Sequence, residues 1–187
     1  MKNNSKPRVV AIIPSRLESS RLPRKALVDI CGLPMIVHVF KRCLYTSSLD
    51  DVYVATDSDE IRNIVEKFGG KAIMTSPNHE NGTERIAEAA KKIEADIIVN
   101  VQGDEALVIP SHIDSVVKAL INDKTVNVAI LVNEFSKENS PADIKVVLDA
   151  NNNVLYLSRS DIPSNSRSSD FSFLKAYHIV PFRKSFL

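Results

Sequence analysis

Several sequence features are rare in this chain of 187 residues or absent from it, and each absence excludes a class of protein. The only cysteines are Cys31 and Cys43, too few for a disulfide framework or a thiolate zinc site. The patterns GxxxxGK[ST] and GxGxxG do not occur, which excludes a P-loop and a dinucleotide-binding fingerprint. The N-terminal residues MKNNSKPR lack the apolar core of a signal peptide, and no apolar run reaches membrane-spanning length. We therefore expect a soluble, cytoplasmic protein with reduced thiols.

An excess of charge of either sign is also missing. The 24 lysines and arginines nearly balance the 23 acidic residues, giving a net charge of +1. Such a chain has no general attraction to nucleic acid or to a membrane, so any anion site must be local. An apolar content of 44% and a charged content of 25% are typical of a globular protein, and we expect a single domain over residues 1–187.

Local positive charge follows the first expected strand. Residues 9–13 form an apolar, β-branched run that predicts a strand buried on both faces, ended by Pro14. The next segment sets one acid, Glu18, against four cations: Arg16, Arg21, Arg24 and Lys25. A loop at the carboxyl end of a buried parallel strand is where open α/β sheets bind ligands, and the cations favour a phosphate. The alternative is a solvated basic loop.

The rest of the sequence alternates between strand and helix patterns. We expect helices at 34–45, 58–68, 83–94 and 111–123, and strands at 51–56, 71–74, 96–101, 126–133, 145–148, 154–158 and 177–182. Capping boxes are predicted at Asp57 with Glu60 and at Asn81 with Glu84, and His38 is expected to have a packing role. The alternation predicts an α/β fold with a mostly parallel sheet and helices on both faces.

The segment QGDE follows the second strongly apolar strand. Asp104 stands directly after Gly103, where a carboxylate is well placed to hold a divalent cation. The alternative is a turn aspartate that bonds its own backbone. Magnesium is usually held by one or two carboxylates together with substrate phosphates. Cations in one loop and an aspartate in the other are therefore the parts of phosphoryl or nucleotidyl transfer.

Five ordered blocks resemble the 3-deoxy-manno-octulosonate (Kdo) cytidylyltransferases, also called CMP-Kdo synthetases. The blocks are IIPSRLESSRLPRKALVDICGLPMIVHV, VATDSDEI, HENGTERIAEA, IIVNVQGDEALVIP and KVVLDANNNVLYLSRSDIP. Because they are spread in order along the sequence, the resemblance covers nearly the whole chain. The resemblance implies a Rossmann-like nucleotide-diphospho-sugar transferase fold, CTP as donor and Mg²⁺ as cofactor. The sugar's anomeric hydroxyl would attack the α-phosphorus of CTP and release pyrophosphate, in lipopolysaccharide or capsule biosynthesis.

The resemblance also implies roles for residues of the basic loop. Arg16, Arg21 and Lys25 would clamp the triphosphate and stabilise charge on the leaving pyrophosphate, a role for which preorganised cations are suited. Ser19 and Ser20 would donate hydrogen bonds to the same oxygens.

Four further residues complete the site that the resemblance implies. Arg85 would contact the cytidine, and Gln102 would contact the ribose or the sugar. Asp104 would bind Mg²⁺ and assist catalysis. Arg159 would approach the carboxylate of the sugar acid, which a bidentate guanidinium fits well.

The sequence departs from the family pattern in several places. Arg24 stands where the family commonly has glycine, which makes the phosphate loop more cationic. Ala176 and Val180 occupy two positions at which a histidine and a tyrosine would reach the sugar, and His178 is displaced by two residues. The family domain also continues beyond Leu187, with a second metal-binding aspartate and much of the contact of a possible homodimer.

These departures leave the acceptor and the activity open. The acid is either Kdo or a close relative, and an N-acylneuraminate-type cytidylyltransferase is the alternative enzyme. A catalytically silent CTP-binding module is the alternative outside the enzymes. An RNA-binding role for the basic loop is disfavoured, because it lacks interleaved aromatic residues.

Overall fold

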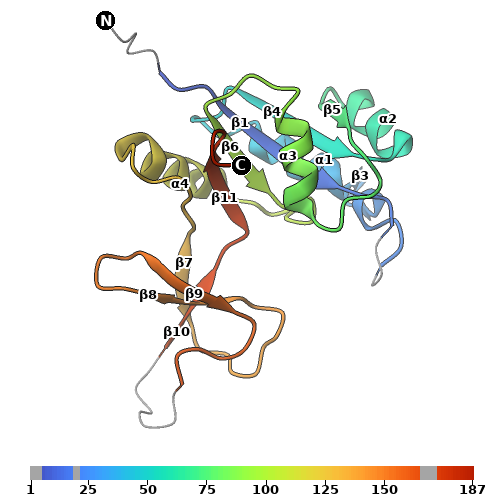
Figure 1. The fold of residues 1–187 in the computed structure, drawn as a ribbon. Helices are drawn as coiled ribbons and strands as arrows, with labels where there is room; N and C mark the ends of the chain where they lie inside the picture. The colour runs from blue at the N-terminus through green and yellow to red at the C-terminus, as the bar shows by residue number, and fades with distance from the viewer. Residues whose placement is uncertain (1–5, 19–21, 165–171) are drawn as a thin grey trace, which may run out of the picture. The chain divides into compact units, whose positions relative to one another are not determined.

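The computed structural model describes residues 6–18, 22–164 and 172–187 (Figure 1). The chain forms two compact units, and the second is inserted into the first. The first unit comprises Met1–Ala129 and Ile179–Leu187, and the second comprises Ile130–His178. No helix in the described ranges has the length and apolar character needed to cross a membrane.

The first unit is built on a sheet with the strand order β11-β6-β1-β4-β5. The strands are β1 (Val9–Ser15), β4 (Asp51–Thr56), β5 (Lys71–Met74), β6 (Ile97–Val101) and β11 (Ile179–Arg183). The first four run parallel, and β11 pairs antiparallel with β6. The expected α/β fold with a mostly parallel sheet is therefore confirmed.

Four α-helices belong to the described part of this unit: α1 (Met35–Cys43), α2 (Asp59–Lys67), α3 (Gly82–Ala90) and α4 (Pro110–Asn122). Helix α3 lies in front of the sheet in Figure 1 and α1 behind it. Ile86 of α3 packs in one buried cluster with Val10, Ile12 and Ile98. The expected packing role of His38 is also observed, since its Nε2 lies 2.7 Å from the carbonyl oxygen of Ile30.

Strand β1 does not end at Pro14, contrary to the prediction. It continues to Ser15, which pairs with Thr56 of β4. Pairing with β6 stops earlier, at Ile12 opposite Asn100. The alternation of the backbone directs position 14 toward β6, so the missing N–H of proline falls where the ladder has already ended. Pro14 therefore costs the sheet no hydrogen bond.

One of the two predicted capping boxes is wrong. Ser58, and not Asp57, caps α2, with its side chain accepting a 3.3 Å bond from the backbone N–H of Ile61. The capping box of α3 is confirmed. The Asn81 side chain accepts from the N–H of Glu84 at 3.0 Å and donates to the Glu84 carboxylate at 2.8 Å.

The second unit contains an antiparallel sheet with the order β7-β10-β8-β9. Its strands are β7 (Val132–Phe135), β8 (Lys145–Leu148), β9 (Val154–Ser158) and β10 (Phe173–Ala176). The strands predicted at 126–133 and 177–182 are displaced, since the structure has strands at 132–135 and 179–183. Both predicted stretches span a point where the chain passes between the two units.

A charged side chain occupies the interior of this second unit. Lys145 is wholly buried, and its Nζ donates to the carbonyl oxygens of Ser140 at 2.7 Å, Asp143 at 3.2 Å and Arg159 at 2.8 Å. The Asp161 carboxylate lies 3.0 Å from the same nitrogen. Oxygen atoms from two segments, residues 140–143 and 159–161, thus surround the buried ammonium group.

Candidate active site

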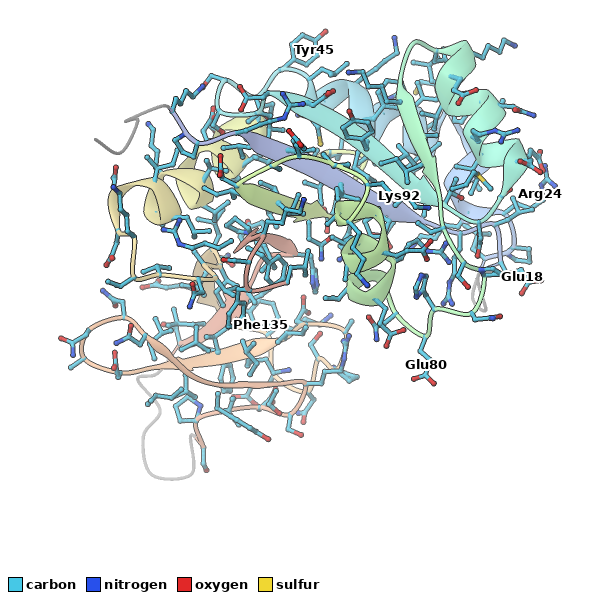
Figure 2. All side chains as sticks on the ribbon, turned by 45° about the horizontal axis from the view of Figure 1, so that its top comes forward. Glu18, Arg24, Tyr45, Glu80, Lys92 and Phe135 are labelled. Carbon is cyan, nitrogen blue, oxygen red and sulfur yellow. The ribbon has the colours of Figure 1, made fainter. Side chains whose placement is uncertain are left out.

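A polar cleft of about 250 Å³ opens at the carboxyl ends of β1 and β6 in the first unit. Figure 2 labels Glu18 and Glu80, two of its lining residues, at the same end of the unit as Arg24. The remaining lining residues are Pro14, Ser15, Arg16, Lys25, Ala26, Met35, His79, Asn81, Gly82, Arg85, Gln102, Gly103 and Asp104. Five residues predicted for the site from the sequence are therefore together in one cleft: Arg16, Lys25, Arg85, Gln102 and Asp104.

A close backbone contact brings the two strand ends together. A Cβ atom at Gly103 would lie 2.6 Å from the carbonyl oxygen of Pro14, closer than real Cβ contacts allow. Only glycine fits against β1 at this point. The contact places the next residue, Asp104, beside the basic loop that follows β1.

Lys25 and Asp104 form an ion pair in the cleft. Lys25 begins a short 3-10 helix, η1 (Lys25–Leu27), and Asp104 lies in the turn after β6. The side chains keep 33% and 45% of their surface exposed. An ion pair this accessible to solvent contributes only about 0.2–1 kcal/mol. It is therefore easily exchanged for other partners.

Asp104 is suited to a single-carboxylate magnesium site. Its turn is closed by the backbone, with Glu105 N–H donating to the Gln102 carbonyl at 3.1 Å, while its carboxylate pairs with Lys25. In the described part of the chain no group of three or more His, Cys, Asp or Glu side chains forms a metal cluster. A single carboxylate still fits Mg²⁺, because this ion retains waters and binds substrate phosphates.

Arg24 has a different role from its neighbour Lys25. Its backbone is left-handed, with φ 57° and ψ 29°, which costs a non-glycine residue roughly 1–2 kcal/mol. Its N–H donates to the Leu17 carbonyl at 3.2 Å, and its guanidinium pairs with Glu60 of α2. Arg24 does not line the cleft. The positive charge that it adds to this loop is therefore paired with α2 instead of facing the cleft.

Arg85 lines the cleft, but its guanidinium already has two protein partners. Its Nη1 donates to Thr75 Oγ1 at 2.6 Å, and its Nη2 donates to Asp57 Oδ2 at 2.8 Å. The residue is 3% exposed. This contact also explains the failed cap prediction, because the Asp57 carboxylate is engaged by Arg85 instead of the N-terminus of α2.

Two polar residues on the cleft wall are held by neighbours. His79 is the first residue of the HENGTERIAEA block but was not singled out as a site residue, and its Nε2 lies 2.6 Å from Glu88 Oε2. A backbone hydrogen bond from Ser76, followed by the contact with His79, lowers the pKa of Glu88 to about 2. The Gln102 amide donates to the Asn100 side chain at 3.3 Å.

The other predicted site residues are in two further places. Arg21, Ser19 and Ser20 lie outside the described residues. Arg159 belongs to the second unit, where it follows β9. Its Nη1 donates to the carbonyl oxygens of Pro141 at 2.8 Å and Ala142 at 3.1 Å.

A mostly parallel sheet with a polar cleft at its carboxyl edge, where Arg16 and Lys25 lie with Asp104, fits the nucleotidyltransferase class. The chain belongs to the cytidylyltransferase family, whose model matches residues 10–187. It is 40% identical over 182 residues to the 3-deoxy-manno-octulosonate cytidylyltransferase of Escherichia coli, covering 96% of this chain and 74% of that protein. The enzyme of the same name from Geobacter metallireducens is 43% identical over 160 residues, which cover 84% of this chain and 63% of the relative.

A solved structure agrees with these relatives. It is a CMP:2-keto-3-deoxy-manno-octonic acid synthetase complexed with CTP, with a TM-score of 0.91 and 40% identity. The match covers 95% of this chain and 75% of that one. The family resemblance noted in the sequence is thereby confirmed.

Proposed function

We propose that this chain transfers CMP from CTP to the anomeric hydroxyl of Kdo, with release of pyrophosphate. The observation that carries the proposal is the convergence of Arg16, Lys25 and Asp104 in one cleft of the first unit. Relatives named for this reaction, and a neighbouring structure complexed with CTP, support both substrates. The product would supply lipopolysaccharide biosynthesis. We place the reaction in the cytoplasm, where CTP is available.

The cations of the cleft would bind the triphosphate and stabilise the leaving pyrophosphate. Arg16 and Lys25 come from the loop after β1 and line the cleft. Arg21 of the same loop would join them. Cations that are already in position when charge develops contribute most to electrostatic catalysis.

Asp104 would hold Mg²⁺ beside the phosphates. When bound, the ion would neutralise negative charge on the phosphate oxygens. The chain itself positions the Asp104 carboxylate at the carboxyl end of β6. The close contact of Gly103 with Pro14 fixes the backbone there. Arg85 and Gln102, on the same cleft wall, would border the nucleoside.

Arg159, in the second unit, would bind a sugar carboxylate. With Nη1 of Arg159 donating to two carbonyls, its Nε and Nη2 edge is the one suited to a bidentate carboxylate contact. The side chains of Ala176 and Val180 are apolar, so neither can form a hydrogen bond with the sugar.

A homodimer is also part of the proposal, through strand β9. This strand is at the edge of the second unit's sheet, and four successive apolar residues on it are exposed: Val154, Leu155, Tyr156 and Leu157. An edge strand can pair antiparallel with its own copy about a two-fold axis, which makes the surface self-complementary. Sedimentation of the wild type and of Leu155→Lys tests this, and an unchanged oligomeric state would contradict it.

The test of the activity is pyrophosphate release with CTP, Mg²⁺ and Kdo, repeated with UTP and with N-acetylneuraminate. We expect release with CTP and Kdo that Asp104→Asn abolishes. Preference for neuraminate would favour the other enzyme class. Stabilisation by CTP without release, for every acid, would instead make the chain a silent nucleotide-binding module.

A further inference from the structure

The ion pair between Lys25 and Asp104 lies inside the cleft assigned to the nucleotide, so it must change when substrates bind. We propose that Lys25 acts as a placeholder for the divalent cation: the triphosphate draws Lys25 away from Asp104 and so opens the carboxylate to the metal. Cation and nucleotide then bind cooperatively. The proposal rests on the proposed function, because it requires CTP and a cation in this cleft.

The geometry brings together groups from distant parts of the chain. Lys25 and Asp104 are 79 residues apart, and both line the same cleft. Asp104 is fixed through Gly103 against the carbonyl oxygen of Pro14, whereas Lys25 reaches it by a long flexible side chain. Of the two partners, Lys25 is the one that can move.

Charge competition makes the exchange necessary. A magnesium ion on Asp104 would place two positive charges within a few ångströms of the Lys25 ammonium, and the repulsion disfavours occupation of both positions at once. The triphosphate offers the ammonium several anionic oxygens in place of one carboxylate. Lys25 therefore has a better partner when nucleotide is bound, and Asp104 has a better partner when metal is bound.

The exchange is inexpensive because the pair is accessible to water. With 33% and 45% of their side-chain surfaces exposed, Lys25 and Asp104 form an ion pair of modest strength. The penalty that it imposes on either ligand alone is about two- to fivefold in affinity, and binding of the first ligand removes the penalty for the second.

The first experiment measures CTP binding in EDTA, without metal. Asp104→Asn should bind CTP about two- to fivefold tighter than the wild type, since Lys25 no longer has a competing carboxylate. The matched control is Glu60→Gln, which removes the same charge from the Arg24 pair outside the cleft. Its affinity for CTP should equal that of the wild type.

The second experiment measures binding of Mn²⁺ alone by electron paramagnetic resonance, without nucleotide. Lys25→Met should bind Mn²⁺ about two- to fivefold tighter than the wild type. Arg24→Met removes one positive charge from the adjacent residue and should leave Mn²⁺ affinity unchanged. Asp104→Asn should lose the site in both backgrounds.

The outcomes separate this inference from the proposed function. Equal CTP affinity of the wild type and Asp104→Asn in EDTA, or equal Mn²⁺ affinity of the wild type and Lys25→Met, would overturn the exchange while leaving the transferase proposal in place. A wild-type chain that fails to bind CTP even with Mg²⁺ would overturn both.

Discussion

Lys25 in the first unit and Lys145 in the second are both paired with aspartates, but their surroundings are opposite. Lys25 meets one carboxylate in an open cleft and is 33% exposed. Lys145 is wholly buried among three carbonyl oxygens and the Asp161 carboxylate. A buried charge with its hydrogen bonds satisfied is committed to the fold, whereas an exposed pair is available for exchange. The comparison separates a structural lysine from one suited to binding substrate.

The largest expected effect is on the structural side of this comparison. Lys145→Met should lower the free energy of unfolding by ~3–5 kcal/mol, because Asp161 and three carbonyl groups lose their shared donor. Urea denaturation measures this loss. Lys25→Met is the control and should change stability by less than about 1 kcal/mol. Equal losses in the two variants would remove the distinction.

The next effect is on activity and has the reverse pattern. Lys25→Met should raise the activation free energy by ~2–4 kcal/mol, the range for losing one preorganised charge. Pyrophosphate release under saturating CTP and Kdo measures it. Arg24→Met, whose side chain pairs with Glu60 outside the cleft, provides the comparison and should retain near-normal turnover.

A change in the second unit should affect one substrate only. Arg159→Lys removes the guanidinium fork while keeping the charge, so we expect a several-fold higher KM for Kdo, corresponding to about 1 kcal/mol, with an unchanged KM for CTP. Initial-rate kinetics with each substrate varied in turn supply both values. A matching rise for CTP would argue against a carboxylate-binding role.

The smallest effect is a pH dependence of stability in the first unit. The pKa of Glu88 is lowered from 4.5 to about 2, mainly by the Ser76 N–H and then by His79. Because the folded-state pKa is depressed, this group stabilises the fold above about pH 5, and the contribution disappears as pH falls toward 2. Wild type and Glu88→Gln should therefore differ in urea midpoint at pH 7 and converge as the pH approaches 2. A constant difference would contradict the assignment.

Much of the fold was predictable because its signals are local. Strands at 51–56, 71–74, 145–148 and 154–158 have the predicted bounds, since apolar runs and turn residues mark both of their ends. Failures occurred where distant residues decide. Asp57 has a capping sequence around it, yet Arg85, 28 residues further on, takes its carboxylate. The strand predicted at 126–133 failed because the chain leaves one compact unit there for another.

The cleft was predictable in part for the same reason. Arg16 and Lys25 belong to the segment after one apolar strand, and Asp104 lies in the turn after another. Parallel strands end at a common edge, so the convergence of these residues could be foreseen. The pairing of Lys25 with Asp104 depends on side-chain reach across 79 residues of sequence. His79 lines the same cleft, although only its place at the start of the HENGTERIAEA block pointed to the site. The local sequence pattern predicts where the strands end. Which side chains contact one another at those ends depends on the tertiary fold.

Strand β11 also bears on how such a protein is made and varied. It is synthesised after the whole second unit, yet it completes the sheet of the first by pairing with β6. During synthesis on the ribosome, the sheet of the first unit therefore cannot be completed until the second unit has been made. The backbone of Ala129 donates to the Pro181 carbonyl at 3.4 Å, so the chain leaves the first unit and returns to it at neighbouring points. An insertion with adjacent ends can be lengthened, shortened or exchanged with little disturbance to its host.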